Sequence, residues 1–419
     1  MTPSQRPVDM RPDVLVIGAG PAGLTAAADL AGTTAGEVLV LDREENAGGI
    51  PRHSDHLGYG VRDLHRMLTG PDYARRLVDA ATAAGATIRT RAMVTGWDAD
   101  GSAEVTTPTG RLLVRAKATV LATGARERPR SARLVPGDRP RGVLTTGQLQ
   151  NLVHLHHADP GHRAVVVGGE LVSWSAVLTL REAGCRTVLL TTEYPSPESY
   201  AVFNLAGRLA LRTPVATGTR VVDIIGEGRV RAVVVESIET GQRRTVECDT
   251  VVFTGDWIPD HELARLGGLE LDTHTRGPRV DTALRTSRPG FFAAGNLVHP
   301  VDTADISALD GRHVAAGVRA YLEGARPSGP AALILADKPF RWIAPNVLRP
   351  DDPAPPRGRL LLWTDELVRR PHISVRQNGY ELAHARLRWP ASPGRVVRVP
   401  SSLLDGIDPA AGDVTVGLR

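Results

Sequence analysis

The stretch that decides the fold is VLVIGAGPAGL, residues 14–24. Four apolar residues of high β-propensity lead directly into the pattern Gly-x-Gly-x-x-Gly. The small residues TAAADL, 25–30, follow with helical spacing, and a second apolar run, VLVL at 38–41, ends at Asp42. This order of strand, glycine turn, helix, strand and acid is typical of a dinucleotide-binding unit, so the sequence predicts a nucleotide site here.

Each glycine of this pattern has a separate physical task. Gly18 makes the tight turn, Gly20 lets a pyrophosphate approach the backbone, and Gly23 lets the helix pack closely on the strand. The helix begins at Pro21 and Ala22, where free backbone N–H groups and the positive end of the helix dipole favour phosphate. We therefore expect the phosphates to lie over residues 18–23.

Three further segments carry a family resemblance. Asp42 is followed by Gly48-Gly49, residues 120–125 read VLATGA, and residues 286–296 end in FFAAGN. Together with the first glycine turn, these segments resemble the two-dinucleotide-binding-domain flavoproteins of the pyridine nucleotide-disulfide oxidoreductase type. The resemblance covers residues 13 to about 325.

The resemblance implies non-covalent FAD as the cofactor. Asp42 is expected at the ribose, a backbone group near Val94 at the adenine, and the start of the helix near Thr303 at N1 of the flavin. The last motif usually ends in Gly-Asp, whose acid reaches the ribitol; Asn296 stands there instead and still forms hydrogen bonds. The implied FAD contacts are Gly18, Gly20, Pro21, Ala22, Gly23, Asp42, Arg43, Gly49, Ile50, Val94, Ala122, Thr123, Gly124, Gly295, Asn296, Thr303 and Ala304.

Composition excludes several classes of function. The chain has 419 residues, 42% of them hydrophobic, which suits two or three globular domains. Its net charge of +4 comes from scattered arginines, and aromatic residues make up only 4%, so no nucleic-acid surface is expected. There is no apolar run of about 18 residues, so we expect no membrane span. Residues 1–12 lack a signal-peptide core, and we expect a flexible tail on a cytoplasmic protein.

The two cysteines limit the chemistry further. Cys185 and Cys248 are far apart in the sequence and form no Cys-x-x-Cys pair. A disulfide reductase of this type needs a redox pair beside the flavin, and an iron–sulfur cluster needs about four cysteine ligands. Both activities are therefore excluded for this chain alone.

The predicted fold class is α/β, with two Rossmann-like, three-layer nucleotide-binding domains and a small β-rich C-terminal appendix. Within the first domain we expect helices over 71–85 and from about Thr303. The connector should carry a short helix over 147–158. The predicted boundaries are 13–125 with 254–325 for a discontinuous FAD domain, 126–161 for the connector, 162–253 for the second nucleotide-type domain, and 330–419 for the appendix.

The second domain carries a degenerate glycine pattern. After the strand at 164–167, the turn reads Gly168-Gly169-Glu170, with Ser173 at the last glycine position. A carboxylate at the middle position repels phosphate, since two like charges about 4 Å apart cost about 1 kcal/mol even in water. NAD(P)H binding is therefore doubtful. A different register of the loop, which would still admit the cofactor, is the competing interpretation.

Without NAD(P)H, the flavin must take electrons from the substrate itself. The motifs, with GVLTTGQ at 142–148, resemble flavin subunits of amino-acid dehydrogenases, opine oxidases and hydrogen cyanide synthase. This resemblance implies oxidation of a C–N bond in an amine or amino acid, with electrons passed to oxygen, a quinone, a protein or a second subunit. An NAD(P)H-dependent flavin reductase, and a flavin-carrying subunit inactive without its partner, remain as alternatives.

Substrate-side candidates lie in the loop that follows Gly48-Gly49. Arg52 could hold a carboxylate and His53 could take a proton; the alternative is that His53 and His56 only bond backbone or FAD. No metal site is expected. The histidines within 154–157 are expected on the surface, and Asp302 and Asp305 are expected to cap the helix that follows them.

Overall fold

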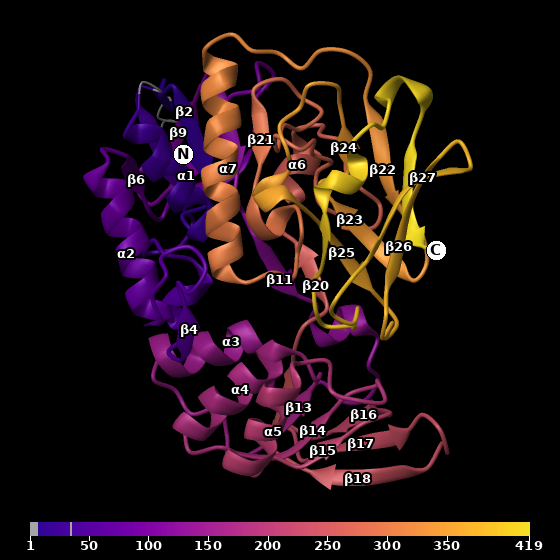
Figure 1. The fold of residues 1–419 in the computed structure, drawn as a ribbon. Helices are drawn as coiled ribbons and strands as arrows, with labels where there is room; N and C mark the ends of the chain where they lie inside the picture. Colours follow the sequence, from indigo (N-terminus) through magenta and orange to yellow (C-terminus); the bar gives the residue numbers. More distant parts are fainter. Residues whose placement is uncertain (1–6, 34–35) are drawn as a thin grey trace.

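The structure is a computed structural model that describes residues 7–33 and 36–419. It contains two Rossmann-like nucleotide-binding domains and a C-terminal module of β-sheets, as the sequence predicts (Figure 1). Within these described residues, no helix is both long enough and apolar enough to cross a membrane.

The first domain is built on a five-stranded parallel sheet. The strand order is β21-β10-β2-β3-β6. Every residue of β2, β3 and β10 is buried, which explains their unbroken apolar sequences, because helices or other layers cover both faces. β21 arrives from beyond the second domain, so two chain segments build this sheet. The bounds are β2 Val14–Ile17, β3 Val38–Leu41, β6 Thr87–Arg89, β10 Ala118–Leu121 and β21 Phe291–Ala293.

Three long helices pack on this sheet. α1 (Pro21–Ala31) and α7 (Ala304–Leu322) lie side by side, and their contact needs Gly311, whose added Cβ would lie 2.3 Å from the Ala22 oxygen (Figure 1). α2 (Gly70–Ala83) agrees with the predicted helix and begins at Thr69, whose hydroxyl accepts a hydrogen bond from the Asp72 amide at 3.3 Å.

A four-stranded layer corrects the prediction for the N-terminus. Its order is β1-β9-β8-β7, with β1 formed by Val8–Met10 and paired in parallel with Leu112–Val114. Residues 8–10 are therefore a strand and not part of a flexible tail; three residues are too short for a sequence signal, and pairing with a distant strand decides their state. Residues 1–6 lie outside the described part. The other bounds are β7 Met93–Trp97, β8 Ala103–Thr107 and β9 Gly110–Val114.

The second domain repeats the parallel pattern and adds an antiparallel sheet. Its parallel sheet has the order β12-β19-β13-β14-β15, and β16-β17-β18 form the added sheet. In the connector, α3 (Thr146–Gln150) runs on into one π-helical turn, Asn151–Leu155. The bounds are β12 Val143–Thr145, β13 Arg163–Val167, α4 Leu171–Glu182, β14 Arg186–Thr191, α5 Ala201–Ala210, β15 Val215–Ala216, β16 Thr219–Ile225, β17 Ala232–Ser237, β18 Arg243–Glu247 and β19 Thr250–Phe253.

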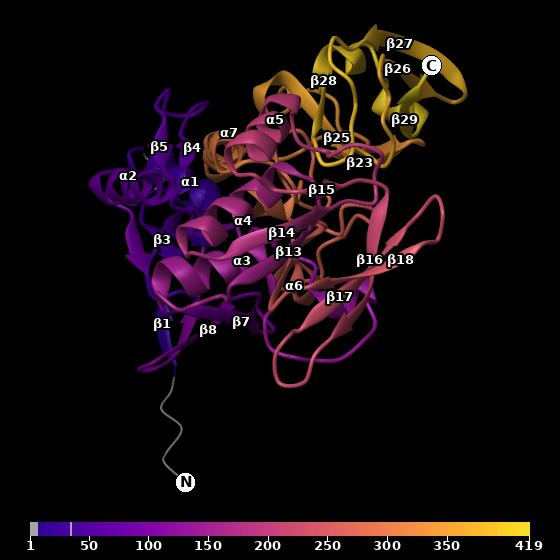
Figure 2. The same ribbon diagram turned by 90° about the horizontal axis from the view of Figure 1, so that it is seen from below.

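The C-terminal module consists of two sheets around their own apolar core. One has the order β24-β22-β29-β26-β27 and the other β23-β25-β28. In Figure 1 this module flanks α7, and Figure 2 shows it from below. It contacts the second domain through Arg395, which donates to the Glu198 oxygen at 2.8 Å. The bounds are β22 Ala332–Ala336, β23 Phe340–Ala344, β24 Val347–Leu348, β25 Arg359–Thr364, β26 His372–Gln377, β27 Tyr380–Arg386, β28 Val397–Pro400 and β29 Val414–Leu418.

Two smaller elements link the halves of the chain. β11 (Ala125–Glu127) pairs antiparallel with β20 (Trp257–Pro259), and the short helix α6 (Glu262–Leu266) follows. β11 leaves the first domain and β20 re-enters it, so this pair forms the crossing between the two nucleotide domains.

Candidate functional site

The first glycine turn has the geometry of a phosphate cradle. Gly18 has φ +108°, and a Cβ there would lie 2.4 Å from the Ala122 oxygen. A Cβ on Gly23 would lie 1.9 Å from the Gly18 oxygen, so strand and helix touch only because both residues are glycine. By contrast, the nearest atom to a Cβ on Gly20 is the Gly49 Cα at 4.0 Å. The space over Gly20 is therefore open at the start of α1.

The Gly48-Gly49 turn lies directly against this cradle. The Gly48 amide donates to the Ala19 oxygen at 2.8 Å. Gly49 has φ +65°, and a Cβ on it would lie 2.8 Å from the Gly20 Cα. Two turns almost thirty residues apart in the sequence thus meet backbone to backbone, which explains why position 49 needs glycine.

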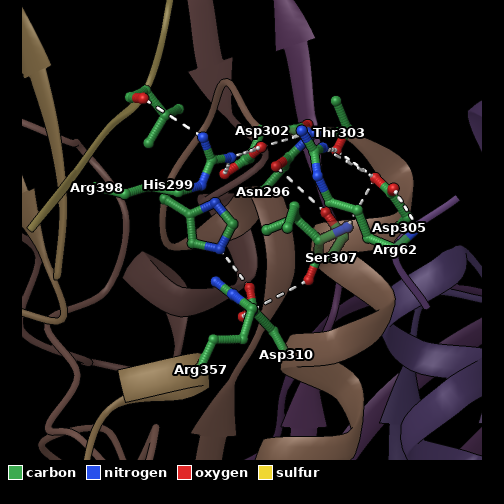
Figure 3. Close-up of polar contacts among 12 residues, drawn as sticks. Arg62, Asn296, His299, Asp302, Thr303, Asp305, Ser307, Asp310, Arg357 and Arg398 are labelled. Atoms are coloured by element: carbon green, nitrogen blue, oxygen red, sulfur yellow. Dashed lines mark hydrogen bonds and ion pairs between the residues drawn. The ribbon is translucent and has the colours of Figure 1, made fainter. Parts of the chain in front are cut away.

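The remaining predicted motifs surround the same place. Gly295, with φ +71°, packs against Ala22, since a Cβ on it would lie 2.9 Å from the Ala22 Cβ. Asn296 donates to the Asp302 oxygen at 2.9 Å and accepts from Ser307 at 3.3 Å (Figure 3). On the opposite side, the Thr123 hydroxyl donates to the Asp260 oxygen at 2.7 Å. The amide that replaces the usual acid is thus held at the start of α7.

Asp42 and Arg43 mark the other end of the site. Asp42 accepts hydrogen bonds from the Ala19 amide at 2.6 Å and the Glu44 amide at 2.8 Å. An open hollow of about 520 Å³ begins beside it and is lined by Arg43, Glu44, Glu45, Arg91, Met93, Thr106, Thr107 and Pro108. Met93 precedes Val94, so the hollow lies where the adenosine end is expected.

These residues fit a long dinucleotide. The first glycine turn with the open space over Gly20 follows the carboxyl end of β2, and the hollow beside Arg43 follows that of the neighbouring β3. Which side chains touch FAD stays a prediction.

The comparison with known families decides the membership of this chain. The model of the family "Pyridine nucleotide-disulphide oxidoreductase" matches residues 12–315. The chain belongs to this family. It is therefore a flavin-dependent oxidoreductase, and the residues that form the cradle lie inside the matched range.

Individual relatives fall into two groups. An opine oxidase subunit of Agrobacterium tumefaciens is 29% identical over 68% of this chain and 61% of its own length. The alpha subunit of sarcosine oxidase from Corynebacterium is 30% identical over 71% of this chain but only 31% of its own length. Thioredoxin reductase of Treponema pallidum is 28% identical over 68% of this chain and 88% of its own length. The chain thus spans 58–71% of the length of the opine oxidase subunits that it matches.

Solved structures agree on the fold. Thioredoxin reductase of T. acidophilum has a TM-score of 0.62 at 24% identity and covers 75% of this chain and 98% of its own. L-Proline dehydrogenase of P. horikoshii has a TM-score of 0.57 at 18% identity and covers 78% of this chain and 58% of its own.

The two cysteines of this family member form no disulfide. Cys185 and Cys248 are buried free thiols, and burial raises the pKa of each to about 12. A thiol with such a pKa carries almost no thiolate at neutral pH, so neither supports disulfide exchange.

The second glycine turn has the register that the sequence predicts. Gly168 takes the place of Gly18: its amide donates to the Thr191 oxygen at 2.8 Å, as that of Gly18 does to the Leu41 oxygen at 2.8 Å. Glu170 is the N-cap of α4, as Gly20 is of α1. Glu170 therefore brings a side chain and its carboxylate to the position where the first domain has the open space over Gly20.

Other groups of the protein pack into this turn. A Cβ on Gly169 would lie 2.2 Å from Oε2 of the buried Glu198. Gly394 of the C-terminal module covers the same place, since a Cβ on it would lie 2.4 Å from the Glu198 Cβ and 3.1 Å from the Glu170 Cγ. Arg395 donates to the Glu198 oxygen at 2.8 Å. The pyrophosphate position of the second domain is thus occupied by protein.

Glu170→Gln is expected to stabilise the protein at alkaline pH. Burial, and then the charge of Glu198, raise the pKa of Glu170 to about 8. The folded state therefore keeps a proton that the unfolded chain has lost, so this residue's contribution to stability falls as pH rises from about 4.5 to about 8. Unfolding midpoints measured from pH 5 to pH 9 should fall less steeply in the variant. If the unfolding midpoints of the variant and the wild type fell equally steeply with pH, Glu170 would be solvated and its pKa would not be raised.

The structure places Arg52 and His53 in the 3₁₀ turn Ile50–His53. His53 is buried, its Nδ1 has no partner, and burial together with the charges of Arg52 and His154 lowers its pKa to about 4. A neutral imidazole is able to accept a proton but is a weak base. An Arg52 terminal nitrogen lies 3.7 Å from Glu44, so the guanidinium turns toward the ribose end.

Replacing Arg52 or His53 with alanine tests the substrate role of this turn. A lost charge-assisted contact is worth roughly 1.5–3 kcal/mol, so flavin reduction by substrate should slow on the order of tenfold to a hundredfold. Flavin occupancy should be unchanged, as measured from the absorbance ratio of flavin to protein. Wild-type reduction kinetics in both variants would leave the turn with a structural role only.

The prediction for His154 was wrong. His154 is not on the surface: its side chain is 9% exposed and lies 3.3 Å from Asp55 and 3.7 Å from Glu182. The N-cap of α7 is Thr303, but Asp302 and Asp305 do accept hydrogen bonds at the start of this helix, from the Thr303 amide at 2.9 Å and the Ile306 amide at 3.1 Å. Each acid also pairs with a distant arginine, a contact that local sequence does not reveal (Figure 3).

One site residue had no signal in the motifs. Arg62 donates from its backbone to Asp305 at 3.1 Å and from its guanidinium to Thr303 at 3.1 Å, which fixes it at the start of α7 (Figure 3). The local sequence indicates only a turn before Arg62, through Gly58 and Gly60. Both glycines have positive φ in the structure.

Proposed function

We propose that this protein is an FAD-dependent dehydrogenase or oxidase that oxidises a C–N bond of an amine or amino acid and is reduced directly by that substrate. The observation that carries the proposal is the second glycine turn, filled by Glu170, Glu198 and Gly394. A family member whose nicotinamide position is closed must obtain electrons from another source.

The choice of substrate class rests on the relatives. Two of them are named for the oxidation of opines and of sarcosine, which are amino-acid derivatives with a C–N bond open to oxidation. The missing cysteine pair argues against the chemistry for which the thioredoxin reductases are named. When bound, FAD accepts a hydride equivalent from such a substrate.

The chain's own groups are suited to this task. The amides of Ala304 and Asp305, in the first turn of α7, would offer a partial positive charge that favours an anionic reduced flavin, whereas the Thr303 and Ile306 amides donate to Asp302 and Asp305. His53 is neutral at physiological pH and can accept a hydrogen bond from a neutral amine. Arg52 supplies a cation in the same turn for a carboxylate.

A flavin-carrying subunit that needs a partner is the second candidate. It is favoured by the coverage of the relatives: the chain spans 61% of the opine oxidase subunit and 31% of the sarcosine oxidase alpha subunit. An NAD(P)H-dependent flavin reductase is the third, and it requires the closed turn to open.

Anaerobic flavin bleaching separates the three. We expect a panel of amines and amino acids to include one that bleaches the flavin rapidly, while NADH and NADPH do so slowly or not at all. The double variant Glu170→Gly with Ser173→Gly should improve nicotinamide binding, if anything, with Glu198 and Gly394 still in place. Rapid bleaching of the wild type by NADPH, or NADP bound across Gly168 in a crystal, would sink the proposal. Bleaching only after a second protein is added would favour the second candidate.

A further inference from the structure

The turn that carries His53 is held by a helix of the connector. Gln150, the last residue of α3, donates from Nε2 to the Ser54 hydroxyl at 3.3 Å. His154, in the π-helical turn that follows, lies 3.3 Å from Asp55. Ser54 and Asp55 come directly after His53 in the sequence, and helical residues four positions apart are neighbours on one face. Two successive residues of the turn are therefore each held by a side chain from the same helix face.

The same two side chains also reach α4. Gln150 donates to the Ser175 hydroxyl at 2.8 Å. His154 forms a hydrogen bond with the Thr179 hydroxyl at 3.4 Å and lies 3.7 Å from Glu182. Positions 175, 179 and 182 share one face of α4, because they are four and three residues apart. We call this set the polar junction: Ser54, Asp55, Gln150, His154, Ser175, Thr179 and Glu182.

The polar junction is buried where it meets the turn. Ser54 is 1% exposed and Gln150 is 4% exposed. Water cannot easily replace a hydrogen bond in such a place, so each lost partner leaves a buried polar group unsatisfied. The helix is also unusual here, because the His156 amide donates to the Asn151 oxygen, five positions earlier, at 3.2 Å. Such π-helical turns are rare and occur frequently at functional sites.

The ring of His53 is not tied down by these contacts. It is 6% exposed, and its Nδ1 has no hydrogen-bond partner among the described residues. The backbone beneath it is fixed, since the Ser54 amide donates to the Pro51 oxygen at 3.1 Å and a Cβ on Gly70 would lie 2.2 Å from the oxygens of both residues. Buried polar atoms are nearly always paired, so one without a protein partner indicates a place for a ligand.

We propose that Gln150 and His154 are positioning residues, which hold the turn so that the unpaired nitrogen of His53 faces the amine of the substrate. This inference rests on the proposed function, because it requires that His53 meets the substrate. It deepens that function by bringing two residues of the connector to the same site.

Charge supports the same arrangement. Burial, and then the charges of Arg52 and His154, lower the pKa of His53 to about 4, against the opposite effect of Asp55. Arg52 and Asp55 belong to the segment of His53 itself, whereas His154 comes from the connector and lies near Glu182. A neutral imidazole is the form that accepts a hydrogen bond from a neutral amine.

Nuclear magnetic resonance of the histidine rings tests the inference without a substrate. The full-length protein is labelled with ¹⁵N-histidine, and the signal of His53 is assigned by its loss in His53→Gln. Gln150→Ala should let water reach the ring, and His154→Gln should remove a neighbouring cation. In both variants the titration midpoint of His53 should therefore rise from about 4 toward the ordinary value of 6.5.

Gln148→Ala is the matched control. Gln148 is an exposed residue of the same type on the same helix, and its side chain accepts from the Thr145 amide at 3.0 Å. Its loss weakens the start of α3 without touching the turn, so the midpoint of His53 should not move. If Gln150→Ala does not fold, as judged by circular dichroism, Ser54→Ala removes the other partner of the same hydrogen bond and takes its place.

Flavin reduction gives the second readout, with a substrate found in the anaerobic screen. At pH 8 His53 is neutral in every variant, so a change in rate reports its position. Gln150→Ala should slow flavin reduction on the order of tenfold, because small misplacements of a reacting group are costly. Gln148→Ala should react as the wild type does, and all variants should keep their flavin.

Three results would overturn the inference. They are an unchanged midpoint of His53 in both Gln150→Ala and His154→Gln, an equal shift in Gln148→Ala, and wild-type reduction rates in variants whose midpoint has moved. If the midpoints move as expected but no amine or amino acid bleaches the flavin, the proposed function fails, while the hold of Gln150 and His154 on His53 stands.

Discussion

Gly20→Glu is expected to abolish flavin binding while the chain still folds. The backbone tolerates a side chain there, because the nearest atom to a Cβ is 4.0 Å away. The carboxylate, however, would project into the space reserved for the pyrophosphate. Like charges about 4 Å apart repel by about 4 kcal/mol near a protein surface, which is about a thousandfold in affinity.

The control for this experiment is Gly20→Ala. Its methyl group fits the same space without charge, so it should retain most of the flavin. The absorbance ratio of flavin to protein and the circular dichroism spectrum report occupancy and folding separately. Full flavin content in a folded Gly20→Glu protein would show that the pyrophosphate lies elsewhere.

Asp310→Ala is expected to destabilise the protein by about 3–5 kcal/mol, the usual cost of breaking a buried ion pair. Asp310 is 1% exposed and accepts from His299 and from Arg357 of the C-terminal module (Figure 3). Burial alone would raise the pKa of Asp310, but the charges of His299 and Arg357 lower it below its usual range. The variant leaves the buried His299 without this partner and removes the ion pair of Arg357, whose side chain is 21% exposed.

The matched control is Asp100→Ala, which breaks an exposed pair with Arg115 and should cost at most about 1 kcal/mol. Denaturant unfolding of both variants measures the difference. Equal stabilities of the two variants would mean that water replaces Asp310 as the partner of His299 and Arg357. The ion pairs of Asp310 would then contribute little to the free energy of unfolding.

The cradle was predictable because its rules are local. Gly18, Gly20 and Gly23 lie within six positions of one another, and each is required by the backbone geometry of a strand that turns into a helix. In the second domain, Glu170 stands at the position that matches Gly20. Its effect on that turn could be predicted for the same reason. Family resemblance then supplied the distant motifs at 122–124 and 295–296.

The contacts that close the second turn were not predictable, because they join segments far apart in the sequence. Arg395 donates to the Glu198 oxygen although the two residues are 197 positions apart in the sequence. No periodic pattern in the sequence indicates that Gly394 packs against Glu198. The burial of His154 has the same origin: Asp55 and Glu182 come from opposite sides of the sequence. The alternation of polar and apolar residues over 372–376 predicted a strand. The local sequence did not indicate which part of the protein the sheet containing this strand covers.

The C-terminal module also supplies cations that the first domain lacks. Arg398 pairs with both oxygens of Asp302 at 2.9 Å, and Arg357 pairs with Asp310. In the full chain both carboxylates are at most 3% exposed. A chain ending near residue 325 would lose the two arginines together with the module that carries them. Shortening this protein to the length of the reductases that it resembles would therefore remove charge partners as well as packing contacts.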